Sequence, residues 1–283
     1  AITYNGEVYN FKELRGELES LGYQFYSQSD TEVILNAFVE WKERCLTKFN
    51  GMFAFAIWDK KEKKLFIARD RYGVKPLYFL HTNNSFIFGS EVKAILKSGK
   101  YTPSLDKEAL VEYLTFQNFF TDKTLFQDIK MLMPGYCAFI SASGQFNEQQ
   151  YWDFNFCGSM KLSEDEAVEE TSRLFEQAVQ RQLIGDVPIN SYLSGGIDSG
   201  AIAMTASQFS PNMKTFTVGF DLMSASGLEL SFDEREKAEH ISYLAKTEHY
   251  EMVLKAGDME RCMQNYVSHL EEPRVGQSYP NYY

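Results

Sequence analysis

The stretch SGGIDSG, residues 194–200, follows an apolar run and directly precedes Ala-Ile-Ala-Met. A strand that passes through a glycine-rich turn into a helix is typical of a βα unit. We place the strand at 189–193. Beyond the turn, the pattern predicts a helix over 201–209, a strand over 215–220, a helix over 233–246 and a strand over 249–254. This βαβαβ order predicts a parallel sheet with crossover helices, which is an α/β fold.

The first half of the chain follows a different pattern. Apolar residues at Phe11, Leu14, Leu18 and Leu21 recur at helical spacing, and a second such stretch covers 31–46. Pairs of strand-like runs separated by short polar turns then predict three hairpins: GMFAFAIWD with KLFIARD, PLYFL with SFIFG, and GYCAFIS with GQFNEQQYW. Antiparallel strands with helices beside them indicate an α+β layered domain.

The two patterns meet between Asp153 and Ser163, where periodicity lapses and we predict a linker. We therefore expect two domains, over residues 1–152 and 163–283. The second opens on a helix, because Ser163 and Glu166 have the spacing of a capping box. The chain starts without an initiator Met and both of its ends read as cut, so we expect it to be an internal segment of a longer protein.

Composition excludes several classes of function. The net charge is −11, from 28 basic and 39 acidic residues, and no basic stripe is visible, which argues against a nucleic-acid partner. No apolar run approaches the roughly 20 residues needed to cross a bilayer, so no membrane partner is expected. The four cysteines are scattered without a CxxC pair, and no signal peptide is present, which favours a reduced, cytoplasmic protein.

The glycine-serine turn has residues suited to a polyphosphate. Gly195 and Gly196 allow close backbone approach, and N–H groups at the start of the next helix attract an anion. Ser194 and Ser199 can donate to phosphate oxygens, whereas Asp198 would repel a bare phosphate and so implies a bridging Mg²⁺. The alternative is a simple strand-to-helix turn in which Asp198 and Ser199 only cap the helix. No lysine follows, so the turn is not a P-loop.

The segment SGGIDS resembles the pyrophosphatase loop of ATP-dependent ligases that release pyrophosphate, including asparagine synthetases, GMP synthetases and tRNA-modifying enzymes. This resemblance implies an ATP-pyrophosphatase domain of the adenine nucleotide alpha hydrolase-like fold. It further implies that Leu193 and Val218 contact the nucleotide, while the loop, Ser194 to Ser199, holds the pyrophosphate. Gly200 departs from the family, in which a second serine is common at this position.

Two short segments near the start of the chain allow two interpretations each. Asn5-Gly6 is typical of a hairpin turn, or these residues could present amide hydrogens to a developing oxyanion. Glu7 could bind an α-ammonium group. Asp30 could do the same, or it could serve as a helix N-cap.

The segments NGEVYNFKELR, SDTEVIL, FNGMFAFAIWD, ARDRYGVKPLYF and GSEVKAIL together resemble the glutaminase domain of class II amidotransferases, an αββα layered sandwich. Their order, followed by SGGIDS, resembles that of glutamine-hydrolysing asparagine synthetase. The resemblance implies that Asn5 and Gly6 form an oxyanion hole and that Glu7 and Asp30 bind glutamine. It leaves a structural role for Arg69, Asp70, Arg71, Gly73 and Lys75.

The implied activity is a C–N bond-forming ligase with ATP and Mg²⁺ as cofactors and with glutamine and aspartate as substrates. ATP would activate the aspartate side chain as an acyl-adenylate, and ammonia from glutamine would displace AMP. The family nucleophile is an N-terminal cysteine, whereas residue 1 here is alanine. Two alternatives stay open: a relative that activates another carboxylate, such as a β-lactam synthetase, and a catalytically incomplete binding or scaffolding piece. A homodimer also stays open.

Overall fold

The computed structural model describes residues 1–156, 158, 161–221, 223, 233–255 and 257–272. The chain divides into two compact units, Ala1–Gly158 and Ser159–Tyr283, and the division falls inside the predicted linker. No helix in the described part combines the length and the apolar character that a membrane span requires.

The first unit is built around two antiparallel sheets within its described residues. The larger has the order β1 (Ile2–Val8), β2 (Gly51–Asp59), β3 (Lys64–Arg69), β7 (Tyr136–Ser141) and β8 (Phe146–Gln150). The smaller has the order β5 (Ser85–Gly89), β4 (Tyr78–Thr82) and β6 (Ile129–Met131). The three predicted hairpins are confirmed as β2–β3, β4–β5 and β7–β8.

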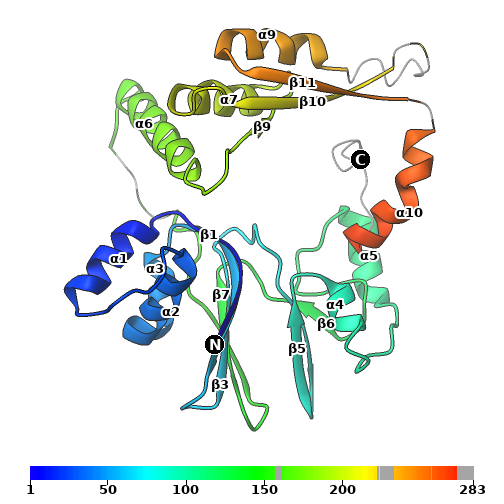
Figure 1. Cartoon of the computed structure of the whole chain (residues 1–283). Helices are drawn as coiled ribbons and strands as arrows, with labels where there is room; N and C mark the ends of the chain where they lie inside the picture. The colour runs from blue at the N-terminus through cyan, green and yellow to red at the C-terminus, as the bar shows by residue number, and fades with distance from the viewer. Residues whose placement is uncertain (157, 159–160, 222, 224–232, 256, 273–283) are drawn as a thin grey trace. The chain divides into compact units, whose positions relative to one another are not determined.

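Helices cover the outer faces of these sheets (Figure 1). On one side lie α1 (Phe11–Ser20), α2 (Asp30–Trp41) and α3 (Cys45–Lys48), and on the other α4 (Val92–Leu96) packs on β4 and β5. A further helix, α5 (Lys107–Phe116), follows α4 in the chain. Alternation of side chains along β2 explains the layering. Phe53 and Phe55 pack with the first helices, whereas Ala54 and Ala56 face the smaller sheet. The predicted αββα sandwich is therefore confirmed.

The second unit contains a parallel sheet in its described part. Its order is β11 (Glu248–Leu254), β10 (Lys214–Phe220) and β9 (Ser191–Tyr192), with both pairs parallel. The helices are α6 (Glu164–Gln182), α7 (Ile197–Phe209), α9 (Arg235–Ala245) and α10 (Asp258–Leu270). Small residues such as Ala203, Ala206 and Ala238 pack α7 and α9 closely together. This arrangement confirms the predicted α/β domain.

Three predicted elements differ from the structure. The helix predicted over 31–46 is divided at Lys42, whose φ of 53° is not helical, so a 3₁₀ turn (Lys42–Arg44) separates α2 from α3. The strand predicted over 189–193 is reduced to Ser191–Tyr192. The helix predicted from Ala201 begins at Ile197, which places the last part of the glycine-serine turn in its first turn. The predicted capping box of Ser163 and Glu166 is confirmed.

Candidate functional site

Asn5 and Gly6 lie inside β1, where they pair with Ala54 and Phe53 of β2, so the hairpin-turn interpretation is wrong. Gly6 has a φ of 153°, outside the range that side chains favour. A Cβ atom at this position would lie 2.1 Å from the Met52 carbonyl oxygen. Only glycine therefore allows the two backbones to approach so closely.

The side chain of Asn5 is held from a distant part of the chain. Its Nδ2 donates a 3.1 Å hydrogen bond to Oγ of Ser90, which directly follows β5. The amide carries two hydrogens, so the second is free to serve another acceptor. Sequence reasoning quoted the segment GSEVKAIL but gave Ser90 no role. Because the two residues are 85 positions apart, only the fold reveals their contact.

Asp30 is tied to β1 and does not cap its helix. Its Oδ2 accepts a 2.7 Å hydrogen bond from the Tyr4 hydroxyl and a 3.0 Å bond from the Val8 N–H. The N-cap of α2 is Ser29, whose Oγ accepts from the Thr31 N–H at 3.1 Å. The N-cap interpretation of Asp30 is therefore wrong. Its carboxylate instead forms hydrogen bonds to β1 on both sides of Asn5 and Gly6.

The Tyr4 hydroxyl stays protonated in this contact. Burial raises the pKa of Tyr4 well above its ordinary value, and the hydrogen bond to the Asp30 carboxylate raises it further. Glu7 lies between Gly6 and Val8 in β1, and its side chain is exposed. The structure thus brings Asn5, Gly6, Glu7 and Asp30 together on or against one strand.

Arg69 and Asp70 organise the turn that follows β3. The buried Arg69 guanidinium donates 2.7–2.8 Å hydrogen bonds to the carbonyl oxygens of Gly73, Lys75 and Leu132. The buried Asp70 carboxylate accepts from the backbone N–H groups of Phe53, Tyr72, Val74 and Lys75. Burial lowers the pKa of Arg69. These contacts confirm a structural role for both residues. They lie next to β2, the strand that pairs with Gly6 on its other edge.

Arg71 is likewise structural. Its guanidinium donates to the carbonyl oxygens of Phe49, at 2.5 Å, and Thr47, at 2.9 Å, at the end of α3. Cys45 and Cys137 are fully buried, and burial raises the pKa of both thiols, to about 11 for Cys137. Neither thiol is therefore suited to act as a nucleophile at neutral pH.

The glycine-serine turn opens α7. Gly196 is the N-cap and has no side chain to cap the helix, so the interpretation of Asp198 and Ser199 as N-caps is wrong. Ile197, Asp198 and Ser199 form the first turn, where backbone N–H groups have no partner within the helix. The side chains of Ile197 and Asp198 are exposed. This end of the helix is therefore accessible to an anion.

The two serines of the turn hold each other. Their Oγ atoms lie 2.8 Å apart, and Oγ of Ser199 also accepts from the Ser194 N–H at 3.0 Å. Oγ of Ser194 accepts from the Gly196 N–H at 3.2 Å. The serines thus shape the turn through hydrogen bonds across it.

The close packing of α9 against the turn explains two of its glycines. A Cβ atom on Gly195 would lie 2.8 Å from Cβ of Lys237. Gly200 is buried, and a Cβ atom there would lie 3.2 Å from Cδ1 of Ile241. The departure at Gly200 is therefore a packing feature, because α7 and α9 meet at this point.

The turn is anchored to the sheet through Leu193. Its N–H donates a 2.8 Å hydrogen bond to the Phe216 carbonyl, and its own carbonyl accepts from the Thr217 hydroxyl. Val218 lies one residue further along β10 and pairs with Met252 of β11. The predicted nucleotide contacts therefore occupy neighbouring positions at one part of the sheet. Sequence reasoning missed Thr217, which joins β10 to the turn.

Arg235 lies across the carboxyl end of β10. It donates to the Phe220 carbonyl at 3.0 Å and forms a bidentate pair with Asp233, which lowers the pKa of Asp233. A Cβ atom on Gly219 would lie 2.3 Å from Cδ of Arg235, so only glycine leaves room for the arginine side chain. In the described part of the chain, no three His, Cys, Asp or Glu side chains are grouped as a metal site.

Comparison with known proteins covers both units. The glutamine amidotransferase domain family matches residues 1–152, and the asparagine synthase family matches residues 170–283. Asparagine synthetase [glutamine-hydrolyzing] 3 of Bacillus subtilis is 38% identical over 96% of this chain and 44% of its own length. Asparagine synthetase [glutamine-hydrolyzing] 1 of the same organism is 36% identical over 96% of the chain and 42% of its length.

A more distant relative carries a different name. Amidase chry2 of Gibberella zeae is 29% identical over 84% of this chain and 37% of its own length. The chain thus spans less than half the length of each of these three relatives. From the two family matches and the two Bacillus relatives, we conclude that the chain belongs to the asparagine synthetase family, with a class II glutamine amidotransferase domain followed by an asparagine synthase domain.

Proposed function

We propose that the chain is part of a glutamine-hydrolysing asparagine synthetase, an ATP-dependent ligase that amidates aspartate. The observation that carries the proposal is the accessible first turn of α7, where open N–H groups and the exposed Asp198 follow a parallel strand. Such a helix start at the end of a parallel strand is suited to polyphosphate binding.

In the synthetase half, we assign pyrophosphate binding to Ser194, Gly195, Gly196, Asp198 and Ser199. Leu193 and Val218 would contact the rest of the nucleotide. Mg²⁺ is usually held by one or two carboxylates together with substrate phosphates, so one exposed aspartate beside the loop fits this ion. When bound, Mg²⁺ would neutralise charge on the departing pyrophosphate.

The proposed reaction in this half has two steps. A side-chain carboxylate oxygen of aspartate attacks the α-phosphorus of ATP, and the bond to pyrophosphate breaks. Ammonia then attacks the activated carbonyl carbon, loses a proton, and AMP leaves with the carboxylate oxygen. The residues of this chain contribute by fixing the phosphates and stabilising their charge.

In the glutaminase half, we propose that Asn5 and Gly6 stabilise the oxyanion formed during glutamine hydrolysis. The support is the fixed position of Asn5, whose amide retains one hydrogen beyond its bond to Ser90. Glu7 and the Oδ1 atom of Asp30 would bind the glutamine ammonium group, because Oδ2 of Asp30 already accepts two hydrogen bonds. Neither Cys45 nor Cys137 is proposed as the nucleophile.

The proposal is tested with the full-length protein, ATP, aspartate and either glutamine or ammonium. We expect asparagine, AMP and pyrophosphate in equal amounts. Asn5→Ala should abolish synthesis from glutamine and preserve synthesis from ammonium, with exposed Asn83→Ala as the control. Asp198→Asn should abolish AMP formation with both donors, with exposed Asp186→Asn as its control. Absence of asparagine with both donors in the unsubstituted protein would contradict the proposal.

A second candidate is a ligase that activates another carboxylate, as the amidase among the relatives makes worth testing. It predicts that aspartate fails to support AMP release while another carboxylate succeeds. Residues 1–283 alone should bind ATP and Mg²⁺ weakly or not at all in calorimetric titration, since we expect further parts of the site elsewhere. Micromolar binding by this segment would contradict that expectation.

A further inference from the structure

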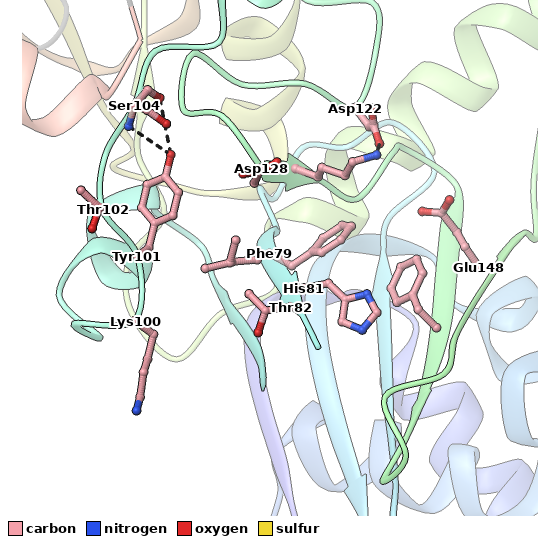
Figure 2. A pocket seen from close by; sticks show the side chains of 13 residues that line it. Phe79, His81, Thr82, Lys100, Tyr101, Thr102, Ser104, Asp122, Asp128 and Glu148 are labelled. Atoms are coloured by element: carbon pink, nitrogen blue, oxygen red, sulfur yellow. Dashed lines mark hydrogen bonds and ion pairs between the residues drawn. The ribbon is translucent and has the colours of Figure 1, made fainter. Parts of the chain in front are cut away.

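The first unit contains a cavity that no proposed reaction uses. Its volume is about 530 Å³. It is lined by residues 79–82 of β4, and by Lys100, Tyr101, Thr102, Ser104, Asp122, Asp128, Lys130, Phe146 and Glu148. Figure 2 shows these side chains around the space at one end of the two sheets. Sites for small organic molecules are of this size, roughly 300–1,000 Å³.

One side of the cavity is aromatic. The rings of Phe79 and Phe146 are stacked with centroids 5.3 Å apart, and the His81 ring lies 5.6 Å from Phe146. Phe79 is buried, so it forms the base of this side, whereas His81 is exposed at its border. His81 is fixed by a 2.9 Å hydrogen bond between its Nε2 and the Gly144 carbonyl. The faces of such rings attract cations.

The same cavity also carries an excess of negative charge. The Lys130 ammonium lies 2.6 Å from Oδ2 of Asp122 and is neutralised by it. Within the described residues, we find no ion pair or hydrogen bond for the carboxylates of Asp128 and Glu148. Lys100 extends away from the other lining residues in Figure 2. Two carboxylates are therefore left without a cation.

The environment of Glu148 agrees with this imbalance. Burial raises the pKa of Glu148, and the negative charge of Asp122 raises it further, against the smaller opposite effect of Lys130. A positive charge placed near Glu148 would relieve both effects. The cavity thus has the electrostatic character of a cation site.

A second cavity of the same unit provides a contrast. It has a volume of about 470 Å³ and lies over Phe38, Phe66 and Phe139. There the chain supplies its own cation, because the Lys42 ammonium lies 5.3 Å from the centre of the Phe38 ring. The Asp59 carboxylate at its border accepts two backbone N–H groups. Among the described residues, no lysine or arginine lies over Phe79, His81 or Phe146 in this way.

We propose that the first cavity binds a small organic compound with a primary ammonium group and an apolar body. The ammonium group lies with the carboxylate of Glu148, which shares one face of β8 with Phe146, and the body lies against the rings of Phe79 and Phe146. This site is independent of the two proposed reaction centres, since it shares none of their residues.

The test compares 2-phenylethylamine with 3-phenylpropionate, which share a ring and have opposite charges, by calorimetric titration of the intact protein. We expect the amine to bind at least about tenfold more tightly than the carboxylate, and more weakly as salt rises. Glu148→Gln should weaken amine binding about fivefold or more, and Asp128→Asn, which removes a more distant charge of the same cavity, should weaken it less. Glu62→Gln, at the second cavity, is the matched control and should leave it unchanged.

Three results would overturn the proposal. One is equal affinity for the two probes, which would indicate that only the aromatic side binds. Another is an equal loss of affinity in Glu148→Gln and Glu62→Gln, which would indicate a general charge effect. The third is no amine binding at about 10 mM. Thermal unfolding of each variant, together with its unchanged far-UV spectrum, establishes that a lost signal is not lost folding.

Discussion

The Tyr4 hydroxyl lies 2.7 Å from Oδ2 of Asp30, and this contact joins the first strand of the chain to the start of α2. The same oxygen accepts the Val8 N–H. Asn5 and Gly6 lie between these two points, so a single carboxylate fixes both ends of the segment proposed to stabilise an oxyanion. The strand is thereby held on one side by a helix and on the other by β2.

Replacing Tyr4 by phenylalanine should lower the free energy of unfolding by about 2 kcal/mol, since hydrogen bonds to charged groups are stronger than neutral ones. Urea unfolding followed by fluorescence measures the change. The matched control is Tyr23→Phe, which removes an exposed bond to Glu40 and should have a much smaller effect. Equal decreases in the free energy of unfolding would show that the Tyr4–Asp30 hydrogen bond stabilises the fold no more than the exposed Tyr23–Glu40 bond.

Gly6→Ala should be strongly destabilising, by several kcal/mol, because its new methyl group would lie 2.1 Å from the Met52 carbonyl oxygen. Gly16→Ala is the natural comparison, since Gly16 lies within α1 and has open space around its Cα. That variant should instead gain about 0.5–1 kcal/mol from higher helix propensity. Thermal and urea unfolding of the pair should therefore shift in opposite directions. A tolerated Gly6→Ala would refute the close approach of β1 and β2.

Asp70→Asn should cost about 3 kcal/mol, because the carboxylate accepts four backbone hydrogen bonds in a buried site. The asparagine NH₂ group would also face N–H donors. Asp59→Asn, at an exposed turn that accepts the N–H groups of Lys61 and Glu62, should lose far less. Denaturant midpoints compare the two, and similar shifts would argue against a central role for Asp70.

Stability should fall at alkaline pH. Burial raises the pKa of Cys137 from the ordinary 9.0 to about 11, and it raises the pKa of Cys45 as well. Because these pKa values are higher in the folded state, the stabilisation is complete below pH 9.0 and is lost as the pH rises toward 11. The free energy of unfolding should decrease by about 1 kcal/mol per pH unit for each thiol in this interval. The measurement is a series of urea curves between pH 8 and 10.5.

The control for this pH dependence is Cys137→Ala, which removes one titrating thiol. Its curves should start from a lower stability and decline less steeply with pH. An unchanged slope would mean that the thiol at position 137 titrates alike in the folded and unfolded states. Tyr4 and Tyr151, whose pKa values burial also raises, act in the same direction from about pH 10 upward, the ordinary tyrosine pKa being 10.0.

Local patterns were sufficient for many elements of the fold. The charged turn KKEK between two apolar runs predicts the β2–β3 hairpin, because both the strand alternation and the turn lie within about twenty residues. The start of α6 could also be predicted from the sequence, because a capping box depends only on Ser163 and Glu166. Such features need no information from distant parts of the chain.

Other features depend on contacts between distant residues. Asn5-Gly6 has the local signature of a turn, yet pairing with β2 extends it, and the glycine serves the approach of Met52. Asp30 has the local position of a helix cap, yet Tyr4 takes its carboxylate and Ser29 caps the helix. The contribution of Ser90 to Asn5 could not be foreseen, because nothing in either segment points to the other.

β1 and β2 also meet at Gly51, where an added Cβ atom would lie 2.1 Å from the Glu7 carbonyl oxygen. Each strand thus places one glycine, Gly6 or Gly51, against the main chain of the other strand. At these two positions the distance between the strands is set by main-chain atoms alone. No larger residue can therefore replace either glycine without moving the two strands apart. Engineering of this unit would have to leave the β1–β2 contact intact and place its substitutions in the surrounding loops.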